Sequence, residues 1–467
     1  MSTVNSKRRT LLLGTRSLVI PTAVFGVSRA TLAAGNDGPR GASGKSPALD
    51  VKRDFNAKAD GATNDYDSFR AALLAAESGG GCVYVPAGTY RIDASPGPLT
   101  VPLGVTLCGE MGRRKGSRID HAAGPVLLDI SGGFSTSGIR GIVITGGLPG
   151  AIGIRVRRFD TRLDSIAFDA WTGDQCVQTD LDPVSGGAYL CHFTNIVIRC
   201  WSGTVGSVNY GIRCLKDFNA SSISNFTING AKVAGIEIRG GASAGIHHGS
   251  LENNPGVGCR IGLSTDTDRI PTAIKIDTIY CEGNGISDYD IQRVNGLLID
   301  NLYGNGHPGL VTTPKGIVIN GTTIRNVKIR GGVYSGHSAT EIDIQKSRDV
   351  ELDGFAGRIT TSNGGGYVRR TSAAASSATS VGTTTTAIVT LTSNEKIAVR
   401  CQVFGDNGSD GFLDDLAFVN GNAPAILSQA TLYGSPAART YTTSGVALRL
   451  SMASGTYQIR VERSESI

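Results

Sequence analysis

Two glutamates, Glu252 and Glu282, occupy equivalent places in two similar segments of the sequence. The segments, Ile246–Asn254 and Ile276–Asn284, align residue for residue with an offset of about 30. If they form neighbouring strands, which lie about 4.8 Å apart, the two carboxylates are side by side. Carboxylates that close repel each other, so that one keeps a proton while the other stays charged. An acid beside a base is what cleavage of a glycosidic bond requires.

Two adjacent histidines, His247 and His248, lie in the first of these segments. Successive side chains of a strand point to opposite faces, so at most one of them joins a site with the glutamates. We expect His248 to be a candidate catalytic residue, with Tyr280 as a further candidate base or substrate-binding group. The other histidines, at positions 121, 192, 307 and 337, are expected at the surface or in turns.

The same seven-residue frame recurs along the chain, and it indicates the elements that position these groups. Each copy reads apolar, two polar, apolar, any residue, apolar, and its last part alternates as a half-buried strand does. Successive copies start roughly 23 to 30 residues apart, which is the length of one coil of a solenoid. The further copies are Ile139–Thr145, Leu163–Asp169, Phe193–Arg199, Ile223–Asn229, Ile299–Asn305, Ile324–Arg330 and Leu352–Arg358.

A second short strand often precedes the frame, and no helical pattern separates the strands, which argues against alternating βαβ units. A single coil cannot bury its apolar face alone, so only a stack of coils is stable. The sequence therefore predicts an all-β protein built on a single-stranded parallel β-helix.

The seventh position of the frame predicts a polar column up one face of this stack. Its members are Thr145, Asp169, Arg199, Asn229, Glu252, Glu282, Asn305 and Arg330. We expect Asp169 to be a further catalytic candidate, and Arg199 and Asn229 to bind substrate. The alternative is a ladder that only satisfies backbone groups, which is the role expected of Asn254, Asn284 and Asn305.

Two tryptophans, Trp171 and Trp201, occupy matching places in consecutive repeats. Stacked on the surface they would form an exposed aromatic platform for the apolar face of a sugar. The alternative is that both rings cap the edge of a coil from inside a loop.

Arginines recur on the outward side of the companion strand, at Arg155, Arg213 and Arg260, with Glu237 between them. They predict a basic stripe suited to a uronate or another acidic sugar, and Arg213 is the candidate that we carry forward. Ordinary solvated surface charge is the alternative.

Composition limits the partners and cofactors. The formal net charge is +6, but residues 1–34 hold five basic residues and no acidic one, leaving 40 basic and 39 acidic residues elsewhere. This balance gives no support for a nucleic-acid or membrane partner. The odd count of 9 cysteines argues against a complete disulfide framework. Cys281 and Cys214 fall on inward positions, and no zinc pattern is present, so we expect small buried hydrophobes and no metal site.

The ends of the chain read as separate segments. Residues 1–34 are predicted to be an export signal, because Ser6–Leu12 resembles the twin-arginine signal and an apolar region follows. Residues 35–48 and 369–386 read as linkers. Strand-like runs separated by turn-rich loops predict a small β-sandwich over residues 387–467. The protein is then exported, to the periplasm or outside a bacterial cell.

The block that opens the repeats, Asp50–Ile92, reads as a turn, a short helix over 67–77 and a strand with a Pro-Ala-Gly turn. This block strongly resembles the opening of the pectate-lyase-like superfamily. The resemblance implies a right-handed parallel β-helix over residues 49–368, with an N-terminal helical cap. The superfamily includes polygalacturonase-like hydrolases, polysaccharide lyases, epimerases and phage tailspike depolymerases.

None of the reaction-specific signatures of the superfamily is visible, including the clustered Asp residues of polygalacturonases, so no catalytic residue is carried over. Three functions remain open. The leading hypothesis is an exported polysaccharide-degrading glycoside hydrolase without a cofactor. The second is a polysaccharide lyase acting on a uronate polymer, with Arg199 or a calcium ion neutralising the carboxylate. The third is a non-catalytic carbohydrate-binding or cell-surface protein. Similarity to tailspikes implies a homotrimer.

Overall fold

The computed structural model describes residues 48–353 apart from positions 113–114, 183–185, 203–204, 268, 307–313, 322 and 346–349. From Ile359 onward it describes the backbone of the strands named below, together with the burial of Tyr441. The predicted export signal and nearly all of the predicted first linker therefore lie outside the described residues.

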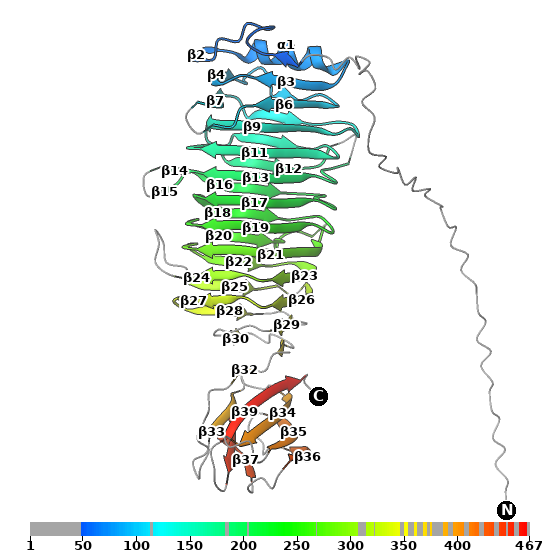
Figure 1. Cartoon of the computed structure of the whole chain (residues 1–467), viewed down its shortest axis with the longest axis vertical. Helices are drawn as coiled ribbons and strands as arrows, with labels where there is room; N and C mark the ends of the chain where they lie inside the picture. The colour runs from blue at the N-terminus through cyan, green and yellow to red at the C-terminus, as the bar shows by residue number, and fades with distance from the viewer. Residues whose placement is uncertain are drawn as a thin grey trace, which may run out of the picture. The chain divides into compact units, whose positions relative to one another are not determined.

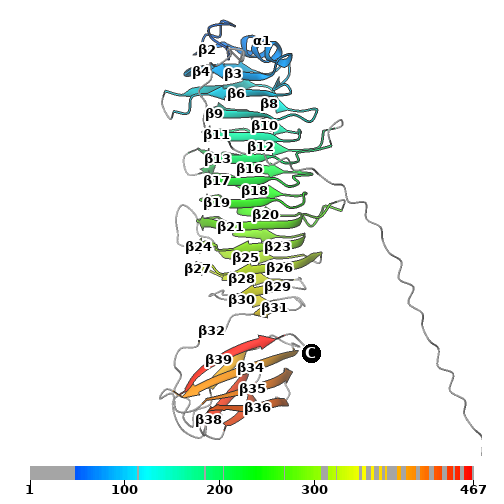
Figure 2. The ribbon, with the colours of Figure 1, turned by 45° about the vertical axis from the view of Figure 1, so that its right-hand side comes forward.

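Most of the described chain winds into coils that stack along one axis, as Figures 1 and 2 show. One sheet of 18 strands and one of 11 strands run along the stack, and every pairing within them is parallel. Strands distant in sequence by one coil are hydrogen-bonded neighbours. This is the parallel β-helix that the repeats predict, right-handed as the superfamily resemblance implies.

The first sheet carries the repeat frame. Its strands are β1 (Leu49–Asp50), β2 (Asp60–Asn64), β3 (Gly81–Val85), β4 (Gly88–Asp93), β6 (Val105–Gly109), β7 (Ser117–Ala123), β9 (Ser137–Gly146), β11 (Thr161–Asp169), β13 (His192–Arg199), β17 (Ser222–Asn229), β19 (Gly245–Glu252), β21 (Thr272–Glu282), β23 (Val294–Asp300), β24 (Tyr303–Asn305), β26 (Ile324–Arg330), β27 (Val333–Ser335), β29 (Val350–Asp353) and β31 (Val368–Arg370).

The second sheet consists of the shorter companion strands. They are β5 (Leu99–Thr100), β8 (Val126–Ile130), β10 (Ile152–Val156), β12 (Gln175–Thr179), β16 (Val208–Cys214), β18 (Ala231–Ile238), β20 (Val257–Ile261), β22 (Ser287–Ile291), β25 (Lys315–Ile319), β28 (Thr340–Ile344) and β30 (Ile359–Thr361). A small antiparallel hairpin, β14 (Trp201–Ser202) and β15 (Val205–Gly206), projects from one turn.

The register confirms the repeat frame through the middle of the stack. Ile166 pairs with Ile196, which pairs with Phe226, and Leu251 pairs with Cys281. The predicted alignment is wrong for the copy Ile324–Arg330. Ile299 pairs with Ile329 and not with Ile324. Arg330 therefore lies opposite Asp300 and does not belong to the predicted column. An alternating apolar run allows both alignments, and strand pairing selects one of them.

The interior of the stack is filled by the inward side chains of both sheets. Phe168, Phe193 and Ile228 have no exposed surface. Cys281 and Cys214 are also fully buried, which confirms their predicted inward positions. Burial of these columns stabilises neighbouring coils against each other rather than any coil alone.

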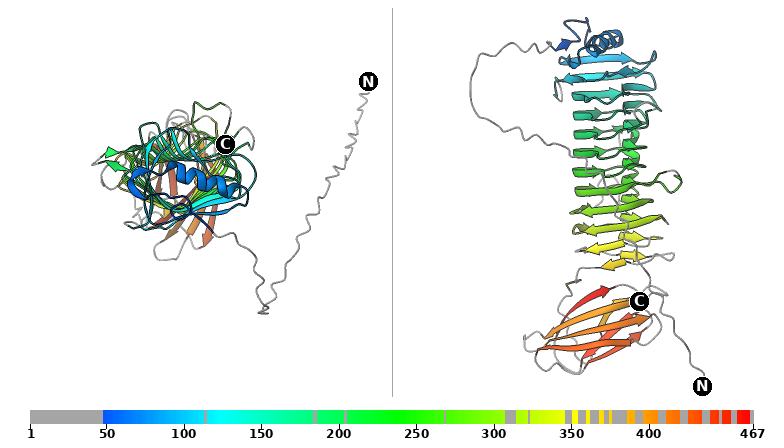
Figure 3. Two further views of the ribbon diagram at one scale, coloured as in Figure 1. Left: turned by 90° about the horizontal axis from the view of Figure 1, so that it is seen from above. Right: turned by 90° about the vertical axis from the view of Figure 1, so that its right-hand side faces the viewer.

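The helix α1 (Tyr66–Glu77) lies across the start of the stack, as the view from above in Figure 3 shows. Its buried residues are Tyr66, Phe69, Ala72, Leu73 and Ala76, spaced as one face of a helix. The helix was predicted over 67–77, and its role as an N-terminal cap was implied by the resemblance.

The last part of the chain forms two antiparallel sheets, in agreement with a small β-sandwich. The five-stranded sheet contains β32 (Ala374–Ala375), β34 (Lys396–Gly405), β35 (Gly411–Val419), β36 (Ala425–Tyr433) and β39 (Tyr457–Ser464). The three-stranded sheet contains β33 (Thr386–Thr390), β37 (Arg439–Ser444) and β38 (Ala447–Met452).

Candidate functional site

Most frame-carrying strands from β9 onward bend sharply at the third position of the frame. The residues at the bend have left-handed backbone angles, with φ between 51° and 69°. We call this set the bend row: Gly141, Ser165, Asn195, Asn225, His248, Thr278, Asn301 and, with the last copy counted from Ile329 as its strand pairing requires, Gly331. Glycine and asparagine adopt this conformation most readily, whereas serine, threonine and histidine do so at a cost. Non-glycine residues held in it are a reason to look for function.

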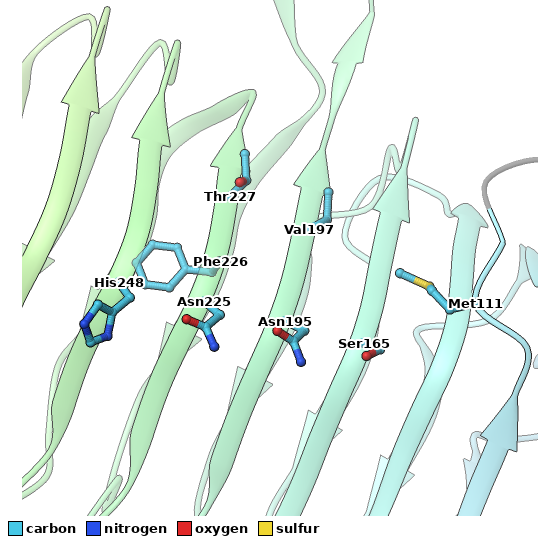
Figure 4. Close-up of a pocket in the computed structure, with 8 residues that line it drawn as sticks. All are labelled: Met111, Ser165, Asn195, Val197, Asn225, Phe226, Thr227 and His248. Atoms are coloured by element: carbon cyan, nitrogen blue, oxygen red, sulfur yellow. The ribbon is translucent and has the colours of Figure 1, made fainter.

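Two shallow hollows lie along the bend row. The first, of about 310 Å³, is lined by Met111, Ser165, Asn195, Val197, Asn225, Phe226, Thr227 and His248. Figure 4 shows Ser165, Asn195, Asn225 and His248 in a row across consecutive strands. The second hollow, of about 420 Å³, is lined by Phe226, His248, Gly249, Thr278, Ile279, Tyr280, Asn301 and Tyr303. His248 contributes to both hollows.

The two glutamates are brought together beside the second hollow. Glu252 and Glu282 are direct partners in the parallel pairing of β19 with β21. Ser250 Oγ donates a hydrogen bond to Glu252 Oε1, and Tyr280 Oη donates one to Glu282 Oε2. Each carboxylate is half-buried and is held by a hydroxyl two residues earlier on its own strand.

Tyr280 is a hydrogen-bond donor at any ordinary pH. Its bond to Glu282, together with burial and the charge of that carboxylate, raises the pKa of Tyr280 to about 12. The same residue stacks on Tyr303 of the next coil, with ring centroids 5.2 Å apart and planes 7° from parallel. Tyr280 therefore links the carboxylate pair to an aromatic surface.

The two histidines occupy different environments. The ring centroids of His247 and His248 are 6.4 Å apart. Burial, followed by the charge of Lys275, lowers the pKa of His247, so this ring is neutral near pH 7. His248 is exposed at the bend and faces the hollows.

The remaining members of the predicted column lie further along the same face. Asp169 pairs with Arg199, and Arg199 pairs with Asn229. Asp169 is three coils from Glu252, or about 14 Å at the usual strand spacing. Its carboxylate lies 3.7 Å from the guanidinium of Arg118. The structure thus does not bring Asp169 to the glutamate pair, whereas Asn229 and Arg199 are one and two coils away from it.

The prediction that Trp171 and Trp201 form an exposed aromatic platform is wrong. Trp171 has no exposed surface, because its ring stacks on His121 and meets the edge of Phe168, with centroid distances of 5.5 and 5.8 Å. Trp201 is half-buried in the hairpin of β14 and β15. Trp171 therefore follows the alternative reading, a ring that packs inside the coil edge. His121, expected at the surface or in a turn, is buried with it.

The prediction of a basic stripe for an acidic sugar is also wrong. Arg213 Nε donates to Glu237 Oε1 at 2.9 Å, and Arg260 Nη1 donates to Glu237 Oε2 at 3.2 Å. The Arg213 guanidinium also lies 4.0 Å over the ring of Tyr210. These arginines belong to a ladder of alternating charge on the second sheet, so their charges are already neutralised and they do not line the bend row.

Two features of the site were not anticipated. Tyr303 was read only as the fifth residue of a repeat, although Tyr280 precedes it at the same position of the frame. The bend row was visible as Asn195, Asn225 and Asn301 at the third position, where the sequence analysis recorded only polar character. Recurrent asparagine is the signal for left-handed backbone that would have located the hollows.

No group of three or more His, Cys, Asp or Glu side chains in the part of the chain that the structure describes is arranged to hold a metal ion. The same part of the chain includes no helix with the length and apolar character needed to cross a membrane.

The coil stack and its bent outer face define the chain as a parallel β-helix of the pectate-lyase-like kind. Residues 49–287 match the model of the family described as rhamnogalacturonase A/epimerase, pectate lyase-like, and the chain belongs to this family.

One curated relative matches over a short stretch. Alginate lyase 7 of Azotobacter vinelandii is 45% identical over 62 residues, which are 12% of this chain and 7% of that protein. The chain thus spans a small fraction of the length of this relative.

The fold agrees with that of a solved tailspike structure. The Dettilon tailspike protein gp208 superposes with a TM-score of 0.51 at 11% identity, covering 89% of this chain and 94% of that one. The A-module of the mannuronan C-5 epimerase AlgE6 of Azotobacter vinelandii gives a TM-score of 0.49 at 16% identity, covering 69% of this chain and 89% of that one. At these identities the similarity concerns the fold alone.

Proposed function

We propose that this protein is an exported enzyme that cleaves a polysaccharide, and that it acts as a glycoside hydrolase through Glu252 and Glu282. One observation carries the proposal: the two glutamates are direct partners on consecutive strands, and Tyr280, which donates a hydrogen bond to one of them, lines an open hollow. Cleavage of a glycosidic bond needs two carboxyl groups on either side of the bond, one giving a proton and one acting as nucleophile or base.

The surroundings of the pair suit this chemistry. Ser250 and Tyr280 each donate a hydroxyl hydrogen bond to one glutamate, which fixes the carboxylates in place. A fixed pair loses little freedom when the substrate binds, and this lowers the barrier of the reaction. The bend row offers amide and hydroxyl groups at one-coil spacing, which suits the hydroxyls of a linear polymer.

Membership of the family also supports a polysaccharide as the substrate. Its description joins a rhamnogalacturonase with an epimerase, and the short match is to an alginate lyase. Polymers of this kind lie outside the cytoplasm, in agreement with the export expected from residues 1–34.

A polysaccharide lyase is the second candidate, and the place of His248 favours it. This exposed residue lines both hollows and is the side chain best placed to remove a proton from a uronate. Tyr280 is a poor base, because its pKa is raised to about 12. Arg199 would then neutralise the uronate carboxylate.

The experiment is an assay of the full chain on neutral and uronate-containing polysaccharides that records new reducing ends and ultraviolet absorbance of unsaturated products together. We expect reducing ends without absorbance. Glu252→Gln and Glu282→Gln should each lower the rate by about 10²-fold or more, since each removes one acid or base. Glu77→Gln, which changes an exposed glutamate of α1, is the matched control.

The other outcomes discriminate between the candidates. Absorbance that rises with cleavage and disappears in His248→Ala would replace the hydrolase with the lyase. Binding of a polysaccharide without any turnover would contradict both enzymes and favour a carbohydrate-binding surface protein.

A further inference from the structure

An exposed apolar surface continues the candidate site by one and two coils. Tyr303 is 42% exposed and Val333 is 59% exposed, and they pair with each other in register. They are two of the ten large hydrophobic side chains that are exposed among the residues whose burial is described. Exposed apolar side chains that adjoin each other and a candidate site mark a binding surface more often than isolated ones do.

The tyrosine stack fixes the orientation of this surface. Tyr280 covers one face of the Tyr303 ring at a centroid distance of 5.2 Å and a tilt of 7°. Tyr280 is in turn held by its hydrogen bond to Glu282. Tyr280 and Val333 thus lie on the coils to either side of Tyr303, so that solvent reaches the outer edge of the Tyr303 ring and the Val333 side chain, where an apolar ligand surface can pack.

The charges near this surface bear on whether the ligand is acidic or neutral. Four carboxylates lie on the coil of Tyr303 and on the two coils before it, from Glu252, Glu282, Asp277 and Asp300. The basic residues placed with them are Lys275, which lies 3.2 Å from Asp277, and Arg330, which pairs in register with Asp300. With Asp277 bound to Lys275 and Asp300 opposite Arg330, the glutamate pair supplies the remaining negative charge, which disfavours an acidic sugar beside it but not a neutral one.

We infer that Tyr303, together with Tyr280 and Val333, forms a binding subsite for a neutral pyranose ring, located beyond the glutamate pair toward the C-terminal coils. The sugar packs its C–H groups across the exposed edge of Tyr303 and the adjoining Val333 side chain. Asn301 and Thr278 of the bend row lie on the same hollow as hydrogen-bonding partners for its hydroxyls. This inference rests on the proposed function, because the sugar belongs to the polymer that the glutamates cleave.

The position of the subsite also indicates how the polymer lies relative to the axis of the coil stack. The first hollow lies on the opposite side of the glutamate pair, toward β11 and β13. A polymer that occupies both regions crosses the pair along the axis of the stack, with sugar residues bound on each side of the bond that is cut. The protein then cuts within chains rather than at their ends.

The test compares Tyr303→Ala with Tyr303→Phe, using as probe a neutral β-glucan or whichever neutral polysaccharide the wild type cleaves. Loss of the ring should raise KM about three- to tenfold and leave kcat nearly unchanged, because the stacking contact is made before and during the reaction alike. Tyr303→Phe keeps the ring and should behave as the wild type. Phe134→Ala removes an exposed aromatic side chain elsewhere and is the matched control.

A binding measurement separates this inference from the proposed function. In the Glu282→Gln background, the affinity for the same polymer should fall three- to tenfold when Tyr303→Ala is added. If the wild type cleaves the polymer and Tyr303→Ala has the kinetics of Phe134→Ala, the subsite is refuted while the hydrolase stands. If Tyr303→Ala changes KM only on polygalacturonate, the preference for a neutral sugar is refuted. If Glu252→Gln and Glu282→Gln both cleave normally, the proposed function fails first.

Discussion

Asp288 and His337 form a hydrogen-bonded pair inside the coil stack, where neither side chain has any exposed surface. His337 Nε2 lies 3.0 Å from Asp288 Oδ2, and Asn284 Nδ2 donates to Asp288 Oδ1 at 2.8 Å. His337 was expected at the surface or in a turn, and that expectation is wrong. A buried charge is stable only with partners. Loss of either residue is therefore expected to lower the stability of the coil stack.

Asp288→Asn is expected to flatten the pH dependence of stability. Burial raises the pKa of Asp288 above its ordinary value of 3.8, against the opposing effect of the bonds from His337 and Asn284. The folded state thus holds the proton more tightly than the unfolded state, so the free energy of unfolding falls as pH rises from about 4 through the raised pKa.

The measurement is denaturant unfolding of the wild type and of Asp288→Asn at a series of pH values. Asparagine keeps the shape and does not titrate, so the advantage of the variant should grow as pH rises. A difference between the two proteins that stays constant from pH 4 to pH 8 would show that Asp288 has an ordinary pKa in the folded state.

At the scale of elements, an internal asparagine ladder ties together the turns that follow the two glutamates. Asn254 Nδ2 donates to Asn284 Oδ1 at 2.9 Å, and Asn284 Nδ2 donates to the carbonyl of Leu251 at 2.9 Å. Both asparagines are fully buried. The ladder role expected for these two residues is the one that the structure displays, and it anchors the chain directly after Glu252 and Glu282.

Asn284→Ala should lower the free energy of unfolding by roughly 3 kcal/mol, because it leaves buried partners without a hydrogen bond. The same change should reduce kcat through movement of Glu282. Asn295→Ala, which removes an exposed asparagine of the neighbouring coil, should alter neither quantity. Equal unfolding curves for the two variants would contradict the role of the ladder.

The sequence predicted most of the coil architecture, because inward apolar columns impose a period that survives in every repeat. Leu251 and Cys281 share a column exactly where the frame placed them, and so do Glu252 and Glu282. The frame slipped at Ile324–Arg330, where an equally apolar residue, Ile329, takes the pairing. A local pattern cannot decide between such alignments, since the decision is made by the neighbouring coil.

The parts of the candidate site that the sequence missed depend on side-chain environment. Trp171 and Tyr303 are both aromatic residues at repeat positions, yet the first is buried and the second is exposed. Arg213 was read as free charge because Glu237 comes from the neighbouring strand β18, and only the register places it beside Arg213. Exposure and pairing are properties of the assembled stack and are not contained in a single repeat.

At the scale of the whole molecule, a solenoid is held together by contacts between neighbouring coils. The coil at each end has a neighbour on one side only and needs a cap to cover its exposed face. Among the described strands, β1 and β2 each pair with a single neighbour and so form the edge at the start of the stack, and α1 lies across this end. Phe69 of α1 is fully buried and meets the edge of the Tyr90 ring with centroids 5.2 Å apart. This contact joins the helix to β4.

Phe69→Ala should therefore destabilise the protein more than its single contact suggests. Removal of a buried phenylalanine costs about 3–5 kcal/mol, and a loosened helix uncovers strand edges that pair with other molecules. We expect a lower unfolding midpoint together with aggregation that increases with protein concentration, measured by light scattering during thermal unfolding. Leu74→Ala, which removes a side chain of the same helix that is 54% exposed, should change stability by less than about 0.5 kcal/mol. If Phe69→Ala loses stability without aggregating, α1 contributes packing energy only, and the end of the stack is protected by another part of the chain.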